Sequence, residues 1–166
     1  MIYMNTRIAK FNFTGIQRYV SEMLTYFGDR VVPISPSRGW EKGWRGHVWE
    51  QFRLPLLLGD KLLFSPNFSG PLSVYRQVVT VHDIAPIEYP DHLTRGYVLW
   101  YRFLIPRLLR RVQRIIAVSN YTKQKIVELI GVDKDKIEVI PNGVDKKFGL
   151  HYGGVTSNTI TDFLGL

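Results

Sequence analysis

Residues 114–145 read RIIAVSNYTKQKIVELIGVDKDKIEVIPNGVD, and this stretch decides the fold. Two short runs rich in β-branched residues, Arg114–Val118 and Ile137–Ile140, predict buried strands. Between them, Tyr121–Ile130 has apolar residues at helical spacing and is followed by Gly131, a residue that favours a helix end. A strand, a helix and a second strand in this order predict two parallel strands joined by a crossover helix.

The same alternation continues toward the N-terminus and extends over residues 1–148. It predicts an α/β fold: a Rossmann-like open parallel sheet of about six strands with helices on both faces. Residues 149–166 have no clear periodicity and repeat glycine, serine and threonine, so we expect an interdomain linker there. The other expected strands are Ile2–Ile8, Val31–Ser35, Leu62–Ser65 and Val78–His82; the other expected helices are Gly15–Phe27, Trp49–Leu58 (interrupted by Pro55) and Leu93–Arg114 (kinked or divided at Pro106), with an irregular Trp-rich loop after Pro36.

Composition narrows the classes of function. The chain has 166 residues, 45% of them apolar, which suits one globular domain. It has no cysteine and only four scattered histidines, so disulfides and zinc clusters are excluded, and we expect no metal site. No segment has signal-peptide character or approaches the roughly 20 apolar residues of a membrane span, so we expect a cytoplasmic protein. The net charge of +8 favours anionic partners, although solubility alone would also account for it.

Polar residues follow the predicted strands at the point where each one ends. They are Ser35, Ser65, His82, Ser119 and Asn142. Ligands of open parallel sheets bind in a crevice at the carboxyl ends of the strands, so these side chains are expected along one crevice. The alternative is that serine and asparagine only begin turns or cap helices, and for Ser119 this alternative is equally strong.

His82 is the strongest catalytic candidate. The run Val78–Val81 predicts a central strand that ends at His82, where an imidazole could donate a hydrogen bond or shuttle a proton. Adjacent strand residues point to opposite faces, so Asp83 can orient His82 only if the chain turns between them. A histidine satisfied within a structural network is the alternative.

A second candidate is Gly15, which opens the first predicted helix after Thr14. A glycine there lets backbone approach a ligand closely, and a helix N-terminus favours an anion. The segment has one glycine and lacks the GxGxxG pattern, so it does not support a dinucleotide site. An ordinary strand-to-helix turn would also explain it.

A third feature is a basic helix face formed by Arg107, Arg110, Arg111 and Arg114, which recur at helical spacing. With aromatic residues nearby, this face could rest on an anionic membrane. The alternative is the solvated basic side of a helix that faces the core.

Several segments together resemble one family. Thr14–Val20, His47–Gln51, His82-Asp83 and the run from Ile116–Ser119 through Val139–Asp145 appear in the same order as in the N-terminal domain of family 4 glycosyltransferases, especially bacterial mannosyltransferases that build surface polysaccharides. The resemblance implies the N-terminal half of a GT-B fold, in which two Rossmann-like domains face a cleft. It also implies retention of anomeric configuration without a metal or other cofactor.

The resemblance further implies roles for individual residues. His82 would contact the transferred sugar as the catalytic residue. Gly15, Thr14, Ser119, Asn142 and Gly143 would lie on the donor side, and Arg18, Glu50 and Asp83 on the acceptor side. GDP-mannose is the favoured donor, UDP-sugars remain open, and the acceptor would be a glycan or lipid-linked. The family's C-terminal donor-binding domain is absent from this sequence, so the chain alone is expected to be inactive.

Two other functions remain open on the sequence. One is a non-catalytic basic binding module for anionic lipid or a phosphorylated ligand. The other is a standalone Rossmann domain for a small phosphorylated ligand. Nucleic acid is not expected as a partner, because no recognition helix or aromatic-basic RNA motif is present. Peripheral contact with the inner membrane face is compatible with the glycosyltransferase reading.

Overall fold

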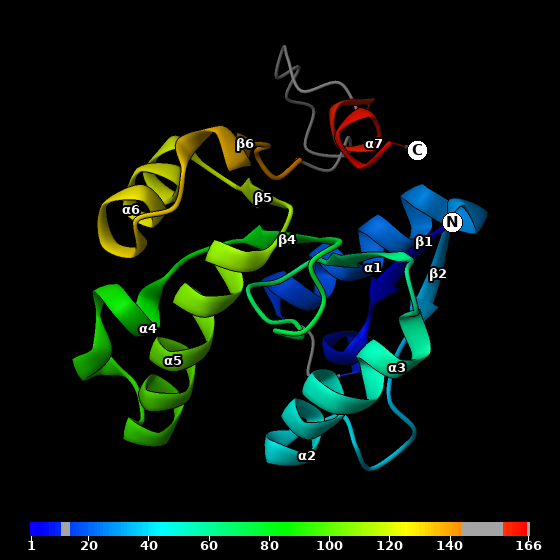
Figure 1. The fold of residues 1–166 in the computed structure, drawn as a ribbon, viewed down its shortest axis with the longest axis horizontal. Helices are drawn as coiled ribbons and strands as arrows, with labels where there is room; N and C mark the ends of the chain where they lie inside the picture. Colours follow the sequence, from blue (N-terminus) through cyan, green and yellow to red (C-terminus); the bar gives the residue numbers. More distant parts are fainter. Residues whose placement is uncertain (11–13, 144–157, 166) are drawn as a thin grey trace.

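A computed structural model describes residues 1–10, 14–143 and 158–165. It contains a six-stranded sheet in the order β2-β1-β3-β4-β5-β6, and every neighbouring pair is parallel (Figure 1). The Rossmann-like parallel sheet predicted from the sequence is therefore confirmed. The strands are β1 (Ile2–Asn5), β2 (Val31–Ile34), β3 (Leu62–Ser65), β4 (Gln77–Val81), β5 (Arg114–Ala117) and β6 (Ile137–Val139).

The first strand is shorter than predicted. It ends at Asn5, and a 3-10 helix follows at Arg7–Lys10, so the expected strand Ile2–Ile8 is wrong in its second half. The Asn5 side chain explains the turn, because its Oδ1 accepts a hydrogen bond from the Arg7 backbone N–H at 3.2 Å. Strand β4 likewise ends at Val81, which leaves His82 just beyond the strand.

The helices that carry clear end signals agree with the sequence. Helix α1 spans Gly15–Phe27 as predicted, and α6 spans Asn120–Ile130 with Gly131 as a left-handed cap at φ 72°. Helix α5 (Arg95–Arg111) is a single helix that contains Pro106, so of the two expected alternatives, a kink or two helices, the second is wrong. Buried leucine and isoleucine side chains on both sides of the proline hold the helix together.

The largest departure lies before Trp49, where the expected helix Trp49–Leu58 begins six residues earlier and replaces the second part of the expected loop. It consists of α2 (Gly43–Val48), a π-helical stretch (Trp49–Arg53) and α3 (Leu54–Leu58). Pro55 lies at the start of α3, directly after the π-helical stretch, and its ring nitrogen cannot donate a helical hydrogen bond. Short helical turns also occur at Gly28–Arg30, Ala85–Glu88 (α4), Pro90–His92 and Lys134–Lys136.

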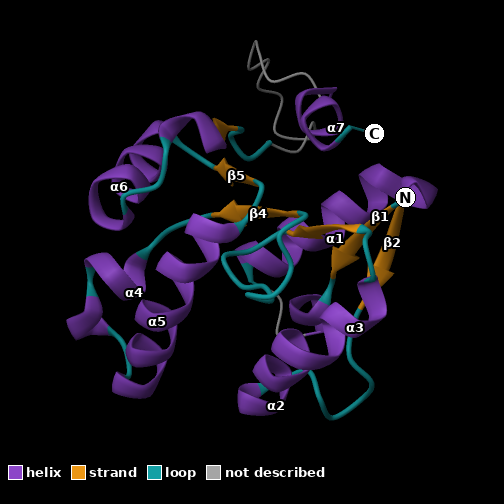
Figure 2. Ribbon diagram, in the orientation of Figure 1, coloured by secondary structure: helices purple, strands orange, loops and turns teal. Residues whose placement is uncertain are grey.

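Helices cover both faces of the sheet (Figure 2). Successive strand residues point to opposite faces, so Val78 packs in the core with α1, while Val79 packs in the core with α5 and α6. A smaller core beneath α3 contains Trp49 and Leu63. Helix α7 (Asn158–Leu164) lies in the segment expected to be a linker and packs on the α1 side. The division into domain and linker stays a prediction, and residues 144–157 lie outside the described residues.

Candidate functional site

The sheet order predicts where a ligand crevice should lie. The chain moves from β1 outward to β2 through α1 on one face, then returns to β3 on the other side of β1 through α2 and α3 on the opposite face. The direction of winding therefore changes between β1 and β3. Ligands of open α/β sheets bind beyond the carboxyl ends of the strands at such a switch point. The loops after β1, β3 and β4 meet there.

His82 lies in this region and is held by its neighbours. Its Nε2 is 3.1 Å from the carbonyl oxygen of Pro66, the residue that follows β3. Its ring meets the Tyr19 ring of α1 edge-on, with the ring centroids 4.8 Å apart. The Thr122 hydroxyl of α6 donates to the His82 carbonyl at 3.5 Å. Three segments distant in sequence therefore converge on this residue.

The environment of His82 sets its protonation. Burial lowers the pKa of His82 below its ordinary value, and the Pro66 carbonyl and the Asp83 carboxylate oppose this only in part. The ring is therefore neutral at neutral pH. A carbonyl oxygen only accepts hydrogen bonds, so Nε2 is assigned as the protonated nitrogen, and Nδ1 is left as an acceptor. Such a ring can receive a hydrogen bond from a hydroxyl group.

Gly15 lies at the start of α1, one turn before Tyr19, and is exposed. A Cβ built on it would have no described atom within 4 Å, and its φ is not positive. Neither backbone conformation nor packing against the described residues therefore demands a glycine here. Space beside a helix N-terminus suits a ligand that carries an anion.

Several other predicted site residues are used by the fold itself. The Thr14 backbone N–H donates to Gln17 Oε1 at 3.1 Å, and the Thr14 hydroxyl also bonds that oxygen, which caps α1. Ser119 Oγ accepts from the Thr122 N–H at 3.1 Å and caps α6. Asp83 Oδ1 accepts from the Ala85 N–H at 3.0 Å and begins α4, so Asp83 does not orient His82.

The remaining candidates lie at the exposed edges. Asn142 and Gly143 follow β6 and are exposed, and a Cβ on Gly143 would meet no described atom within 4 Å. Arg18 is exposed on α1, and its Nε lies 3.8 Å from Glu22 Oε1. The structure thus brings His82 and Ser119 together through Thr122, with α1 alongside, and it leaves the roles of these residues toward ligands as predictions.

Glu50 has a different position from the one expected of an acceptor contact. It is fully buried and bonded by side chains from two other segments. Asn5 Nδ2 donates to Oε1 at 2.8 Å, the Ser69 hydroxyl donates to Oε2, and the buried Arg7 guanidinium lies 3.4 Å from both carboxylate oxygens. The expected direct contact with an acceptor does not fit this burial. The carboxylate instead ties the end of β1 to the loop after β3.

The charge of Glu50 is maintained by this network. Burial alone would raise its pKa, but the Arg7 charge and the neighbouring His47, Ser69 and Asn5 side chains outweigh burial and lower the pKa to about 2. Gly46 completes the arrangement, because a Cβ there would lie 2.4 Å from a backbone oxygen of the preceding loop. The sequence reading missed Arg7, Asn5 and Ser69. Only Glu50 itself could have pointed to this network. It is the only carboxylate in residues 43–58, and a carboxylate is rarely buried unless it is paired with a cation.

The four arginines predicted to form a membrane face are divided by the structure. Arg110 donates twice to the Ile130 carbonyl at the end of α6, at 2.7 and 3.1 Å, and Arg114 donates to the Asp135 carbonyl at 3.0 Å. These two arginines therefore secure the α6–β6 connection. Arg107 lies instead with its guanidinium carbon 4.0 Å from the Phe103 ring centroid, and Arg111 is exposed. A single face of four free arginines is not present.

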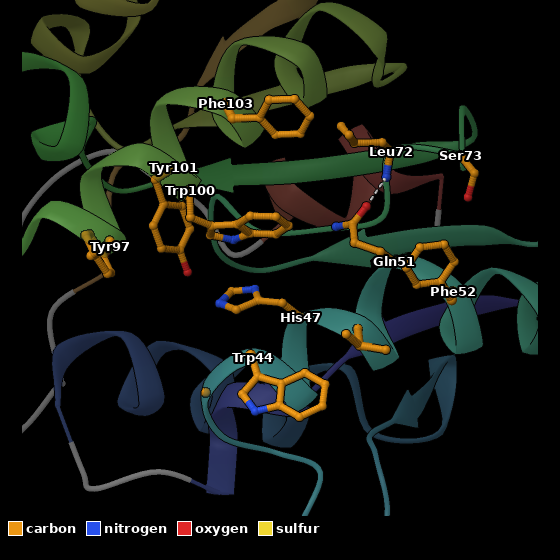
Figure 3. A pocket seen from close by; sticks show the side chains of 13 residues that line it. Trp44, His47, Gln51, Phe52, Leu72, Ser73, Tyr97, Trp100, Tyr101 and Phe103 are labelled. Carbon is orange, nitrogen blue, oxygen red and sulfur yellow. Dashed lines mark hydrogen bonds between the residues drawn. The ribbon is translucent and has the colours of Figure 1, made fainter.

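An aromatic groove that the sequence reading did not identify lies between α2 and α5 (Figure 3). Its volume is about 790 Å³ and its walls are almost entirely apolar. Gln51 links it to the β3–β4 loop, donating to the Gly70 carbonyl at 2.8 Å and accepting from the Leu72 N–H at 3.0 Å. The lining side chains include Trp44, His47, Val48, Phe52, Leu72, Tyr97, Trp100, Tyr101 and Phe103. In the described part of the chain, no helix is both long and apolar enough to cross a bilayer.

Comparison with known proteins identifies the class to which this fold and crevice belong. Residues 30–148, more than half of the chain, match the family described as Glycosyltransferase Family 4, and the chain belongs to this family. It is similar to the O-antigen chain mannosyltransferase RfbU of Salmonella typhimurium (strain LT2), with 34% identity over 99 residues. The similarity covers 59% of this chain and 27% of that relative, so the chain matches only a part of the mannosyltransferase.

Proposed function

We propose that the chain is the acceptor-side half of a retaining glycosyltransferase that acts in surface polysaccharide synthesis. It moves a hexose, with mannose favoured, from a nucleotide-sugar to a glycan or lipid-linked acceptor. Membership of family 4 supports the reaction class, and the similarity to an O-antigen chain mannosyltransferase supports the sugar and the process.

The observation that supports the proposal is Gly15, a glycine one turn of α1 before Tyr19, whose ring contacts His82. Among the described residues no neighbour excludes a side chain there, and the backbone is not strained, yet the residue lies at the N-terminus of α1. Close approach by the donor's phosphate or sugar would explain why this position has no side chain. The N-terminal amides of α1 would stabilise the negative charge on the departing phosphate.

His82 would act on the sugar through the ring nitrogen that remains available. Nε2 is engaged by Pro66, so Nδ1 accepts a hydrogen bond from a hydroxyl of the transferred hexose and orients it. The ring's neutral state at neutral pH suits this task better than catalysis by proton donation. The acceptor hydroxyl then attacks on the face from which the phosphate departs, which retains the anomeric configuration.

The proposal places the nucleotide on a second Rossmann-like domain across the predicted crevice. The test combines this chain with a separately produced C-terminal domain from a family 4 mannosyltransferase, labelled GDP-mannose and a lipid-linked oligosaccharide. UDP-glucose serves as the competing donor.

Transfer from GDP-mannose, lowered about 100-fold by His82→Gln but not by His92→Gln, would support the proposal. No transfer by the combined domains from either donor would contradict it. Binding of anionic lipid that persists without any transfer would favour the non-catalytic module instead.

A further inference from the structure

The helical segment Gly43–Leu58 exposes an apolar stripe. Trp44, Val48, Phe52 and Leu56 follow one another at intervals of four residues, and all four are exposed. Phe52 is 71% exposed and Leu56 is 78% exposed. Single exposed apolar residues are ordinary, but a contiguous apolar strip along a helix marks an interaction surface.

Helix α5 continues this surface on the opposite side of the groove. Leu99 is 72% exposed, and Tyr97 and Phe103 are also exposed at the groove's rim. Trp100 packs between them, with its ring 5.0 Å from His47 and 6.2 Å from Phe103. The stripe and the α5 aromatics therefore form one surface divided by the groove, as Figure 3 shows for the groove's walls.

Cationic side chains accompany these aromatics. Arg45 lies with its guanidinium carbon 5.8 Å from the Trp44 ring centroid, and Arg107 lies 4.0 Å from that of Phe103. Arg53 and Arg102 are exposed on the same two helices. The single carboxylate within Gly43–Leu58 and Arg95–Arg111 is Glu50, which is buried and paired with Arg7. Across both helices, the exposed charge is therefore entirely positive.

We propose that this surface docks on an anionic phospholipid bilayer, with Trp44 and Phe52 inserted at the headgroup level and a lipid hydrocarbon chain in the aromatic groove. Aromatic side chains favour the membrane interface, and arginines beside them attract anionic headgroups. A second copy of the chain is a poorer occupant, because a symmetric contact would bring the same cationic groups against each other.

Membrane docking would bring the protein to a lipid-linked acceptor, and this purpose rests on the proposed function. Helices α2 and α5 each follow a strand end, after β2 and β4, so the docking surface begins at the same edge of the sheet as the His82 crevice. A lipid-linked acceptor held there would reach the crevice from the bilayer. Membrane binding itself needs no sugar transfer and can be measured separately.

The experiment measures binding of the 166-residue chain to vesicles of phosphatidylglycerol and phosphatidylcholine by flotation, with vesicles of phosphatidylcholine alone for comparison. Trp44→Ala and Phe52→Ala should each weaken partitioning roughly tenfold, the scale for withdrawing one aromatic side chain from water. Tyr75→Ala and Leu129→Ala are the matched controls, because both side chains are exposed elsewhere, and they should leave partitioning unchanged. Arg45→Glu with Arg53→Glu should abolish the preference for anionic vesicles.

Three results would overturn the proposal. The first is that the chain fails to float with anionic vesicles. The second is that Trp44→Ala and Phe52→Ala bind as tightly as the parent chain, or that neutral vesicles bind equally well. The third is a dimer, seen by analytical ultracentrifugation and abolished by Trp44→Ala, in a chain that binds no vesicles. Loss of sugar transfer with intact vesicle binding would instead count against the proposed function and leave this inference standing.

Discussion

Replacing Glu50 by glutamine should destabilise the fold by about 3 kcal/mol at pH 7. The substitution preserves the size of a fully buried side chain but removes the charge that Arg7 faces. A pKa lowered from 4.5 to about 2 corresponds to about 3 kcal/mol of native stability, at about 1.36 kcal/mol per pH unit. Breaking a buried ion pair from one side typically costs about 3–5 kcal/mol, which agrees in scale.

The contribution of Glu50 to the free energy of unfolding should also depend on pH in a defined direction. The folded-state pKa of Glu50 is lowered, so its contribution is complete above about pH 4.5 and is lost as the pH falls toward about 2. The difference in unfolding free energy between the parent chain and Glu50→Gln should therefore shrink to about 1.5 kcal/mol at pH 3. Urea titrations followed by circular dichroism at pH 7, 5 and 3 measure it, and the pH 7 midpoint should drop by about 1.5 M.

Two further variants make the result interpretable. Glu22→Gln removes an exposed carboxylate whose distance to Arg18 is 3.8 Å, and it should change stability by less than about 0.5 kcal/mol. Adding Arg7→Met to Glu50→Gln should recover stability, because no unpaired buried charge then remains. A Glu50→Gln variant within about 0.5 kcal/mol of the parent chain at pH 7 would refute the reasoning.

Three other predictions concern single positions. Gly46→Ala should destabilise the fold by about 1–3 kcal/mol in thermal unfolding, because the added Cβ would lie 2.4 Å from a backbone oxygen. Gly96→Ala, in open space on α5, should be neutral or stabilising, and equal effects of the two substitutions would refute the packing argument. In an NMR titration, the pKa of the His82 ring should lie below 6.5. Because the folded-state pKa is lowered, this histidine should reduce the free energy of unfolding as the pH falls below 6.5, and a pKa above 6.5 would contradict its buried, neutral state. Arg110→Ala should destabilise by about 1 kcal/mol in urea unfolding through the lost carbonyl contacts, and Arg102→Ala, on the exposed side of α5, should not; equal losses would contradict the capping role.

The sequence predicted the fold well where local chemistry specifies an element. Helix α1 was predicted at its observed bounds, and Gly131 was recognised as the cap of α6. The helix from Gly43 was missed because its two glycines and its tryptophans resemble a loop when read locally. Gly46 is explained by the Glu41 carbonyl oxygen and the Arg7 guanidinium, which crowd its Cβ position only once the chain is folded. Tertiary packing overrode propensity there.

For the candidate site, too, some features follow from the sequence pattern and others depend on tertiary packing. The strand directions on which the sheet rule depends are confirmed, and the ligand crevice that the rule places at their carboxyl ends stays a prediction. The rule could not tell that Ser119 and Thr14 are occupied as helix caps, or that Glu50 is buried. The aromatic groove was missed for a related reason, since its residues come from two helices and a loop that meet only after folding.

The central claim is that a nucleotide-sugar approaches the N-terminus of α1, one turn before the Tyr19 ring that contacts His82, and Gly15→Ala tests it most directly. Its added Cβ meets no described atom within 4 Å, so the fold should keep its thermal midpoint or gain slightly from the better helix former. Transfer from GDP-mannose by the combined domains should nevertheless fall at least about tenfold, because the methyl group occupies space needed by the donor. Unchanged stability with unchanged transfer would contradict the account.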